Sequence, residues 1–163
     1  MKLSTLNTIL TISSLIGLGL SIYAYYVGLN LEVDPQYEPL CDIHFRISCS
    51  KPFMSRYGKG FGLFPKDSIF YKPNSLFGIF YYSLLTILAQ TNTKFTTTIS
   101  FIAILFSNVA SLWFAYILYF KLFDLCLVCA GTYVVNFTNL LSVNLKLKEV
   151  NDAIMREKKK KRE

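Results

Sequence analysis

The chain has 163 residues, the size of one ordinary domain, and carries 17 Lys and Arg against 10 Asp and Glu, a net charge of +7. Apolar residues make up 53% of it and the mean hydropathy is +0.40, which is high for a soluble protein. The last eighteen residues hold eight basic and four acidic side chains. Because this basic tail follows directly on an apolar segment and lacks interleaved aromatic residues, it favours a cytoplasmic membrane flank over a nucleic-acid-binding segment.

The first apolar run covers residues 6–29, and no charged residue lies between Lys2 and Glu32. Its length is that of a membrane-spanning helix. The alternative is a cleavable signal peptide, but the apolar core exceeds the roughly 7–15 residues typical of such peptides and no clear small-x-small cleavage site follows. We therefore expect a spanning helix.

Residues 30–74 form a polar, irregular segment that contains all five prolines of the chain and two of its four cysteines. Pro and Gly at this density argue against one long helix and favour a loop with short helical pieces. Such a segment is too long for a simple connection, so we expect it to form a functional cap.

Three further apolar runs follow the cap, and a tight turn of four residues separates the last two. Such a short connection favours two antiparallel neighbouring helices. The predicted fold is therefore an all-α integral membrane protein, a four-transmembrane-helix bundle with a long lumenal cap loop between the first two helices. It forms one domain over residues 1–163, with later spans at 75–90, 96–120 and 125–145 and a cytosolic basic tail at 146–163.

Topology follows from the charge distribution. The positive-inside rule places the basic tail in the cytosol, and with four spans the amino terminus lies there too. The cap loop and the tight turn then share the opposite, lumenal side, where disulfide exchange takes place. Lys160 and Lys161 match a dilysine-type retrieval signal for the endoplasmic reticulum, although a lysine-rich tail contains such a pair by chance as readily.

The segment 124–133 holds a Cys-x-x-Cys pair, Cys126 and Cys129, at the mouth of the fourth apolar run. Two thiols at this spacing on a helix share one face, and the positive end of the helix dipole favours the reactive thiolate. The topology places Cys41 and Cys49 of the cap on the same side of the membrane. Four cysteines permit three pairings, which the sequence alone does not distinguish.

Exchange between a loop pair and a helix pair explains this arrangement better than static alternatives. Two permanent disulfides leave unexplained why one pair lies within one helical turn at a bilayer edge. A zinc site is disfavoured because seven residues separate Cys41 from Cys49, wider than the usual two to four, so no metal is expected. Asp124 occupies the position of a helix N-cap.

Two polar residues are candidates for substrate contacts. Tyr133 follows Cys129 by four residues, so its phenol lies on the same helix face, where it either donates a hydrogen bond to a bound carbonyl or joins two helices. Asn74 either begins the second helix or points its amide into the mouth of the bundle.

Several blocks of the sequence resemble the vitamin K epoxide reductase family. The similarity runs from about Ser21 to Phe137, and the four cysteines fall at the family's four positions. The blocks are LCDIHFRISCS (40–50), SRYGKGFGL (55–63), PNSLFGIFYY (73–82) and AYILYFKLFDLCLVCAGTY (115–133), with SIYAYYV (21–27) near the end of the first run.

The resemblance implies a membrane enzyme of the endoplasmic reticulum that reduces vitamin K 2,3-epoxide to the quinone and the quinone to the hydroquinone. By position, Cys126 and Cys129 would be the active pair, with Cys129 nearer the substrate. Cys41 and Cys49 would be the relay pair, with Cys49 exchanging with Cys126. The implied substrate-binding residues are Asn74 and Tyr133, through hydrogen bonds to substrate oxygens, and Phe53, Phe77 and Tyr81, as pocket walls.

The resemblance also implies a lumenal oxidoreductase of thioredoxin fold as electron donor, inhibition by 4-hydroxycoumarins of the warfarin type, and no tightly bound cofactor. Two alternatives remain: a related quinone-dependent oxidase that forms disulfides in lumenal proteins with the same residues, and a non-enzymatic membrane protein with stable disulfides. The chain departs from the family at Tyr57, where animal relatives usually have Trp, and its segment between Gly62 and Asn74 is a few residues shorter than expected. We expect no fused thioredoxin domain after the bundle, unlike in bacterial relatives.

Overall fold

The computed structural model describes residues 2–34, 36–44 and 46–162. Nearly all of its regular structure is helical, and within these residues no β-strand forms beyond three isolated bridges. The prediction of a helical fold is confirmed. In chain order the elements are α1 (Leu3–Val33), α2 (Ser50–Met54), the 3₁₀ turn η1 (Gly60–Gly62), α3 (Asn74–Ala89), α4 (Lys94–Ile117), the π-helical η2 (Leu118–Leu122) and α5 (Leu127–Lys160).

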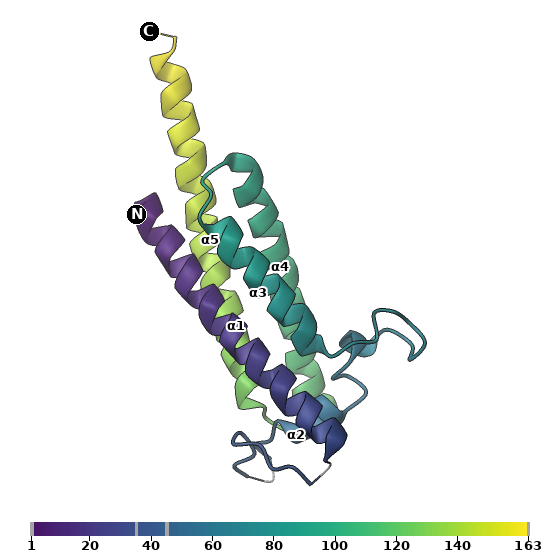
Figure 1. Ribbon diagram of the computed structural model, residues 1–163. Coiled ribbons are helices and arrows are strands. Elements are labelled where there is room, and N and C mark those ends of the chain that lie inside the picture. The colour runs from purple at the N-terminus through teal and green to yellow at the C-terminus, as the bar shows by residue number, and fades with distance from the viewer. Residues whose placement is uncertain (1, 35, 45, 163) are drawn as a thin grey trace.

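The long helices α1, α3, α4 and α5 lie side by side in one bundle (Figure 1). Helix α1 packs against α3 and α5, and α4 packs against α5. Both ends of the chain and the connection from α3 to α4 lie toward one end of the bundle, while α2 and the cap segments lie toward the other (Figure 1). The cap therefore covers the end of the bundle at which α5 begins.

The helices at the two ends of the chain are longer than the apolar runs predicted. Helix α1 ends at Val33, and Asp34 is extended, with φ −129° and ψ 101°. This is the conformation favoured for a residue before proline. Helix α5 continues through the basic tail to Lys160, because the tail contains no Pro or Gly and is rich in residues with high helix propensity.

Lys146, the first residue of the basic tail expected from the sequence, packs against the bundle. The sequence placed it at the start of that tail, yet it is 2% exposed. Its Nζ donates hydrogen bonds of 2.8 Å to the carbonyl oxygens of Ala89 and Thr91. These carbonyls lie at the C-terminal end of α3, where the helix leaves acceptors unpaired and a positive charge is favoured. Lys146 thus joins α5 to the end of α3.

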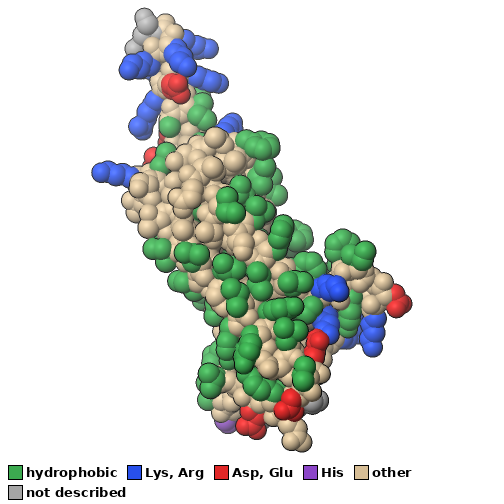
Figure 2. Space-filling view, in the orientation of Figure 1, with side chains coloured by type: hydrophobic (Ala, Val, Ile, Leu, Met, Phe, Trp, Pro, Cys, Tyr) green, Lys and Arg blue, Asp and Glu red, His purple; other side chains and the backbone are tan. Residues whose placement is uncertain are grey.

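The outside of the bundle is strongly apolar. Hydrophobic side chains are spread along the helical body in Figure 2, between areas of backbone and other side chains, while Lys and Arg gather along the far end of α5. Among the described residues, two helical segments are long and apolar enough to cross a membrane, Leu3–Val33 and Lys94–Leu122, and Asn74–Ala89 is a shorter apolar helix. The apolar half of α5 is less hydrophobic because it carries Asn136, Asn139 and Asn144. That four helices span a bilayer remains a prediction.

Small and polar side chains line the interior between these helices. Gly17 of α1 faces the ring of Tyr82 on α3, and the Tyr82 hydroxyl donates a 2.8 Å hydrogen bond to Oδ1 of Asn136 on α5. Asn136 Nδ2 in turn donates to Ser111 Oγ of α4 at 2.8 Å. Small residues and interhelical hydrogen bonds of this kind hold helices together where the surroundings are apolar.

We expect Gly17→Ala to destabilise the bundle by about 1–3 kcal/mol, because overpacking a filled interface costs that much. A Cβ on Gly17 lies 2.4–2.7 Å from atoms of the Tyr82 ring, which is itself fixed by Asn136. Gly19→Ala is the matched control, since a Cβ there meets nothing within 4 Å. Thermal unfolding in detergent measures both variants, and equal unfolding midpoints for the two would contradict this packing.

Candidate functional site

The cap loop is held against the start of α5 by backbone hydrogen bonds. The Leu125 N–H donates to the Arg46 carbonyl at 2.9 Å, and the Ser48 N–H donates to the Leu125 carbonyl at 3.0 Å. The same two segments form an isolated parallel bridge between Ile47 and Leu125. Because residues 47 and 125 are paired, Ser48 lies opposite Cys126, and Cys49, the next residue of the loop, is brought close enough for its sulfur to approach that of Cys126.

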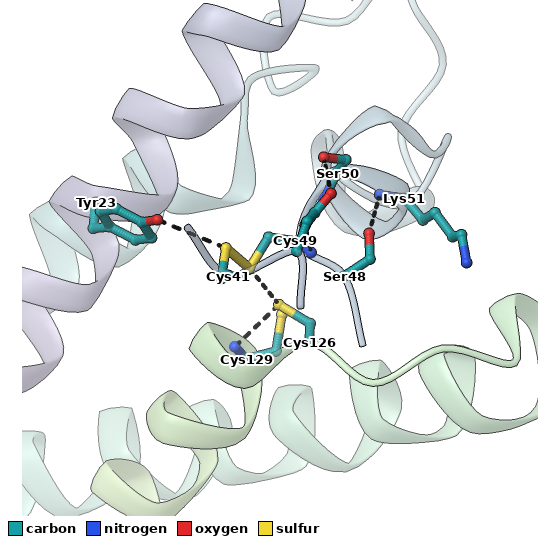
Figure 3. Close-up of a disulfide and its surroundings, with 9 residues drawn as sticks. Tyr23, Cys41, Ser48, Cys49, Ser50, Lys51, Cys126 and Cys129 are labelled. Atoms are coloured by element: carbon teal, nitrogen blue, oxygen red, sulfur yellow. Dashed lines mark hydrogen bonds between the residues drawn. A yellow bond between two sulfur atoms is a disulfide. The ribbon is translucent and has the colours of Figure 1, made fainter. Parts of the chain in front are cut away.

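The structure resolves the pairing that the sequence left open. Cys41 and Cys49 form a disulfide, and Cys126 and Cys129 are free thiols. Cys126 Sγ lies 3.9 Å from Cys49 Sγ, and both cysteines are almost completely buried (Figure 3). An oxidised pair and a reduced pair therefore meet at one sulfur–sulfur contact, across which a thiolate can attack a disulfide.

The two thiols of the Cys-x-x-Cys pair do not share one helix face as predicted. Cys126 precedes the helix as its N-cap, with extended backbone angles of φ −102° and ψ 116°, and its Sγ accepts the Cys129 N–H at 3.3 Å. The expectation that Asp124 is the N-cap is therefore wrong. Asp124 is instead buried two residues earlier and forms an ion pair with Lys51 at 3.8 Å. This backbone turn lets Cys126 face the cap while Cys129 faces the bundle interior.

A cavity of about 340 Å³ lies beneath the cap, between the long helices. Its wall is mostly apolar and aromatic, with a few polar groups, as is typical of small-molecule sites. Cys129 lines this cavity and Cys126 does not. The sequence-predicted residues that line it are Phe53, Asn74, Phe77, Tyr81, Cys129 and Tyr133.

Asn74 begins α3 and fastens the cap to it. Its Oδ1 accepts the Phe61 N–H at 2.8 Å, and its Nδ2 donates to the Tyr57 carbonyl at 2.6 Å. The turn that it holds has positive φ at residues Gly60, Phe61 and Gly62. Glycine adopts this conformation readily, which suits two of the three positions. Asn74 thus starts the helix and lines the cavity, while its amide oxygen and one amide N–H are engaged by the cap.

Tyr133 lies one helical turn beyond Cys129 and lines the same cavity. Its hydroxyl is buried and has no hydrogen-bond partner in the described part of the chain. A buried phenol is normally hydrogen-bonded, so an unpaired one on a cavity wall is suited to a ligand. The interhelical hydrogen bond considered from the sequence is made instead by Tyr82 and, through Ser107 at 2.9 Å, by Tyr81.

Sequence reasoning missed the aromatic roof of the cavity. The Phe61 ring lies 5.2 Å from that of Phe77 and 5.9 Å from that of Phe114, measured between ring centres. The signal was present in the Gly-Phe-Gly run, because glycines on both sides allow a turn that directs the aromatic ring inward. Tyr57, at the departure from the family pattern, also lines the cavity.

The cap is tied to α1 at the cavity edge and stiffened near the disulfide. Lys59 Nζ and Glu32 Oε1 form an ion pair of 2.6 Å, and both residues line the cavity. Asp42 accepts hydrogen bonds from the backbone N–H groups of Cys49 and Ser50 and from the Ser50 hydroxyl. Cys41, Asp42 and Cys49 carry ligand atoms within 4.8 Å of one another, but the disulfide removes both sulfurs as thiolate ligands.

Comparison with known proteins agrees with the resemblance read from the sequence. Residues 8–143 match the Vitamin K epoxide reductase family. The chain is 39% identical over 126 residues to Vitamin K epoxide reductase complex subunit 1 of Mus musculus, which covers 75% of this chain and 78% of that protein. The protein of the same name from Rattus norvegicus gives the same identity and coverage.

The Asp42 carboxylate should protect the loop disulfide in a pH-dependent way. Partial burial by itself raises the pKa of this carboxyl, but the hydrogen bonds from Ser50 and from the backbone of Cys49 and Ser50 outweigh it, so the pKa lies below its ordinary value of 3.8. A lowered folded pKa means that the stabilisation is complete above about pH 3.8 and is lost as the pH falls through the folded value.

We expect Asp42→Ala to speed phosphine reduction of Cys41–Cys49 about tenfold at pH 6, since hydrogen bonds to a charged group contribute about 1.5–3 kcal/mol. The ratio of the reduction rate of the variant to that of the unmodified protein should approach one at pH values below the folded-state pKa of Asp42. Asp34→Ala is the control, because Asp34 accepts the Gln36 N–H at 2.9 Å in the cap but does not contact the disulfide loop. A ratio that stays constant from pH 6 to pH 3 would refute the role of the charge.

Proposed function

Because this chain belongs to the vitamin K epoxide reductase family, we propose that it reduces vitamin K 2,3-epoxide to the quinone and the quinone to the hydroquinone. One observation carries the proposal. A reduced thiol pair lies between an aromatic cavity and a disulfide, with Cys129 on the cavity wall and Cys126 Sγ 3.9 Å from Cys49 Sγ. Such an arrangement suits transfer of electrons from the cap to a ligand in the cavity.

In the proposed reaction, the Cys129 thiolate attacks an epoxide carbon of the bound substrate. The carbon–oxygen bond opens to an alkoxide, which takes a proton from the Tyr133 hydroxyl. The Cys126 thiolate then attacks Cys129 Sγ, so that the Cys126–Cys129 disulfide forms and the carbon–sulfur bond breaks. The electron pair of that bond expels the hydroxyl, which leaves with a second proton as water. The two thiols thus supply two electrons and two protons for each epoxide converted to quinone.

Reduction of the quinone uses the same pair. Cys126 and Cys129 deliver two electrons, and two protons reach the carbonyl oxygens, which gives the hydroquinone and the same disulfide. Tyr133 and the remaining N–H of Asn74 are the proposed hydrogen-bond donors to these oxygens. The rings of Phe53, Phe77 and Tyr81 are the proposed walls for the flat ring system, because aromatic side chains stack on such rings and exclude water.

Electrons return through the cap in the proposed relay. Once the loop pair has been reduced, the Cys49 thiolate attacks Cys126 Sγ and displaces Cys129. Cys41 then attacks Cys49 Sγ, which restores the loop disulfide and releases Cys126 as a thiolate. The described state, with the loop pair oxidised and the helix pair reduced, corresponds to the end of this transfer.

The proposed setting is the membrane of the endoplasmic reticulum, with both termini in the cytosol and the cap in the lumen. The basic end of α5 lies at the opposite end of the bundle from the cap, which supports this orientation (Figures 1 and 2). A lumenal oxidoreductase of thioredoxin fold is the proposed donor to the loop pair. The 4-hydroxycoumarins, which are flat bicyclic rings with adjacent oxygens, are proposed to occupy the quinone cavity.

The relay predicts different losses for two cysteine variants. Cys129→Ala should abolish turnover with any reductant, because the attacking thiol is gone. Cys49→Ala should keep turnover with a small dithiol, which reduces the helix pair directly, but lose it with a protein donor. Assays of epoxide and quinone reduction by the purified proteins measure the activity of both variants. Full activity of Cys129→Ala would refute the mechanism, and a Cys49→Ala variant equally active with both reductants would remove the relay.

The same assay separates the reductase from the oxidase. A quinone-dependent oxidase would leave the epoxide unchanged and form disulfides in an added reduced protein when quinone is supplied. Epoxide turnover supports the proposed direction of electron flow, and disulfide formation without epoxide turnover supports the alternative.

Tyr133→Phe should lower kcat for epoxide reduction about a hundredfold, because loss of a positioned acid typically costs about 10²–10⁴-fold. The ring that packs on the cavity wall is retained, so KM should change by less than about threefold. Tyr119→Phe is the control, since this tyrosine is 72% exposed on the outer surface. Unchanged kcat in Tyr133→Phe would remove the tyrosine from the reaction.

A further inference from the structure

Tyr23 of α1 contacts the sulfur of the loop disulfide that faces away from Cys126. Its hydroxyl donates a hydrogen bond to Cys41 Sγ at 3.8 Å (Figure 3). The Tyr23 ring packs against the buried cluster that contains Cys41, Cys49 and Cys126. The sequence marked Tyr23 only as part of the SIYAYYV block, and the proposed function gives it no task.

The two sulfurs of the disulfide therefore have different neighbours. Cys49 Sγ faces the Cys126 thiol at 3.9 Å, and Cys41 Sγ faces the Tyr23 hydroxyl. When Cys126 attacks Cys49, the leaving sulfur is that of Cys41, and when the relay runs forward, Cys41 is the sulfur that attacks Cys49. In both directions Cys41 carries negative charge at one end of the step, as the leaving thiolate or as the attacking one, and a hydrogen-bond donor is already directed at it.

We propose that Tyr23 is a catalytic residue of the thiol relay, in which its hydroxyl stabilises the Cys41 thiolate as the Cys41–Cys49 disulfide forms and breaks. This inference rests on the proposed relay between the two cysteine pairs. A hydrogen bond to a charged sulfur is stronger than one to the neutral disulfide sulfur, so the phenol favours the state in which Cys41 is free.

The nearby carboxylate makes this donor more important. Asp42 follows Cys41 directly, and its oxygens are engaged by the N–H groups of Cys49 and Ser50 and by the Ser50 hydroxyl. The negative charge of Asp42 disfavours a second negative charge on the adjacent sulfur. Cys41 is also only 7% exposed, so solvent supplies little stabilisation. The Tyr23 hydroxyl, on α1, supplies this stabilisation of the Cys41 thiolate instead.

The exchange step can be isolated without substrate in a Cys129→Ala background. Three cysteines then remain, and an internal equilibrium links two forms: Cys41–Cys49 disulfide with a free Cys126, and Cys49–Cys126 disulfide with a free Cys41. When the free thiol is ionised, one sulfur–sulfur bond forms as another breaks and the negative charge moves from the Cys126 thiolate to the released Cys41 thiolate, so no oxidant or reductant is consumed. Acid quenching followed by alkylation and mass spectrometry gives the ratio of modified Cys41 to modified Cys126.

Adding Tyr23→Phe to this background should lower the ratio of modified Cys41 to modified Cys126 by about ten- to a hundredfold, the effect of losing one hydrogen bond to a charged group. Phenylalanine keeps the ring that packs on the cluster, so the thermal unfolding midpoint should remain within about 2 °C. Tyr26→Phe is the matched control, the same substitution three residues along α1 at a position that is 55% exposed. A ratio in Tyr23→Phe equal to that in Tyr26→Phe overturns the proposal.

Turnover gives a second, independent measurement in the chain with all four cysteines. Tyr23→Phe should slow epoxide reduction severalfold with a protein donor, because the donor reduces the Cys41–Cys49 disulfide more slowly when the leaving Cys41 thiolate lacks its hydrogen bond, while turnover with a small dithiol stays at the unmodified rate. Equal slowing with both reductants overturns the proposal, because it points to a packing defect. If the unmodified protein reduces neither epoxide nor quinone, the proposed function fails, and the exchange ratio still decides the role of Tyr23.

Discussion

The pairing of the cap loop with the segment before α5 is the constraint on which the thiol chemistry depends. Two backbone hydrogen bonds, from Leu125 to Arg46 and from Ser48 to Leu125, set the register between these chains. A shift of one residue in such a pairing turns every side chain to the opposite face. The register therefore decides whether Cys49 meets Cys126 or points away from it. The loop disulfide and the Asp42 hydrogen bonds stiffen the cap side of this contact.

The start of α5 separates the two thiols of the Cys-x-x-Cys pair, so that one lies against the cap and the other lines the cavity. Cys126 is extended and precedes the first helical turn, whereas Cys129 lies within it. One thiol consequently faces the cap and the other faces the cavity, although the two remain close enough for the Cys129 N–H to bond Cys126 Sγ at 3.3 Å. Only a pair at a helix boundary has this property, because thiols at this spacing inside a helix point to the same side.

Hydrogen bonds between helices fix the walls of the cavity. The polar groups that make them would be energetically costly to leave unpaired in an apolar environment. Tyr82, Asn136 and Ser111 form a hydrogen-bonded chain across three helices in the cavity wall, and Asn74 uses its amide to hold the cap over the cavity. These residues are satisfied by one another, and the Tyr133 hydroxyl is not. The contrast distinguishes groups that build the site from the group that is available to a ligand.

The sequence by itself determined the helical class, the approximate position of each long helix, the cap, the family and six of the residues that line the cavity. Apolar run length and Pro and Gly content are local properties, and the spacing of motifs carries the family pattern, so one chain read in order is enough. Only the tertiary structure decided that Cys41 pairs with Cys49 and that Cys49 meets Cys126, because a loop register that no local pattern encodes brings residues 49 and 126 together. It also corrected the N-cap from Asp124 to Cys126 and buried Lys146, since both depend on what a distant segment offers as a partner.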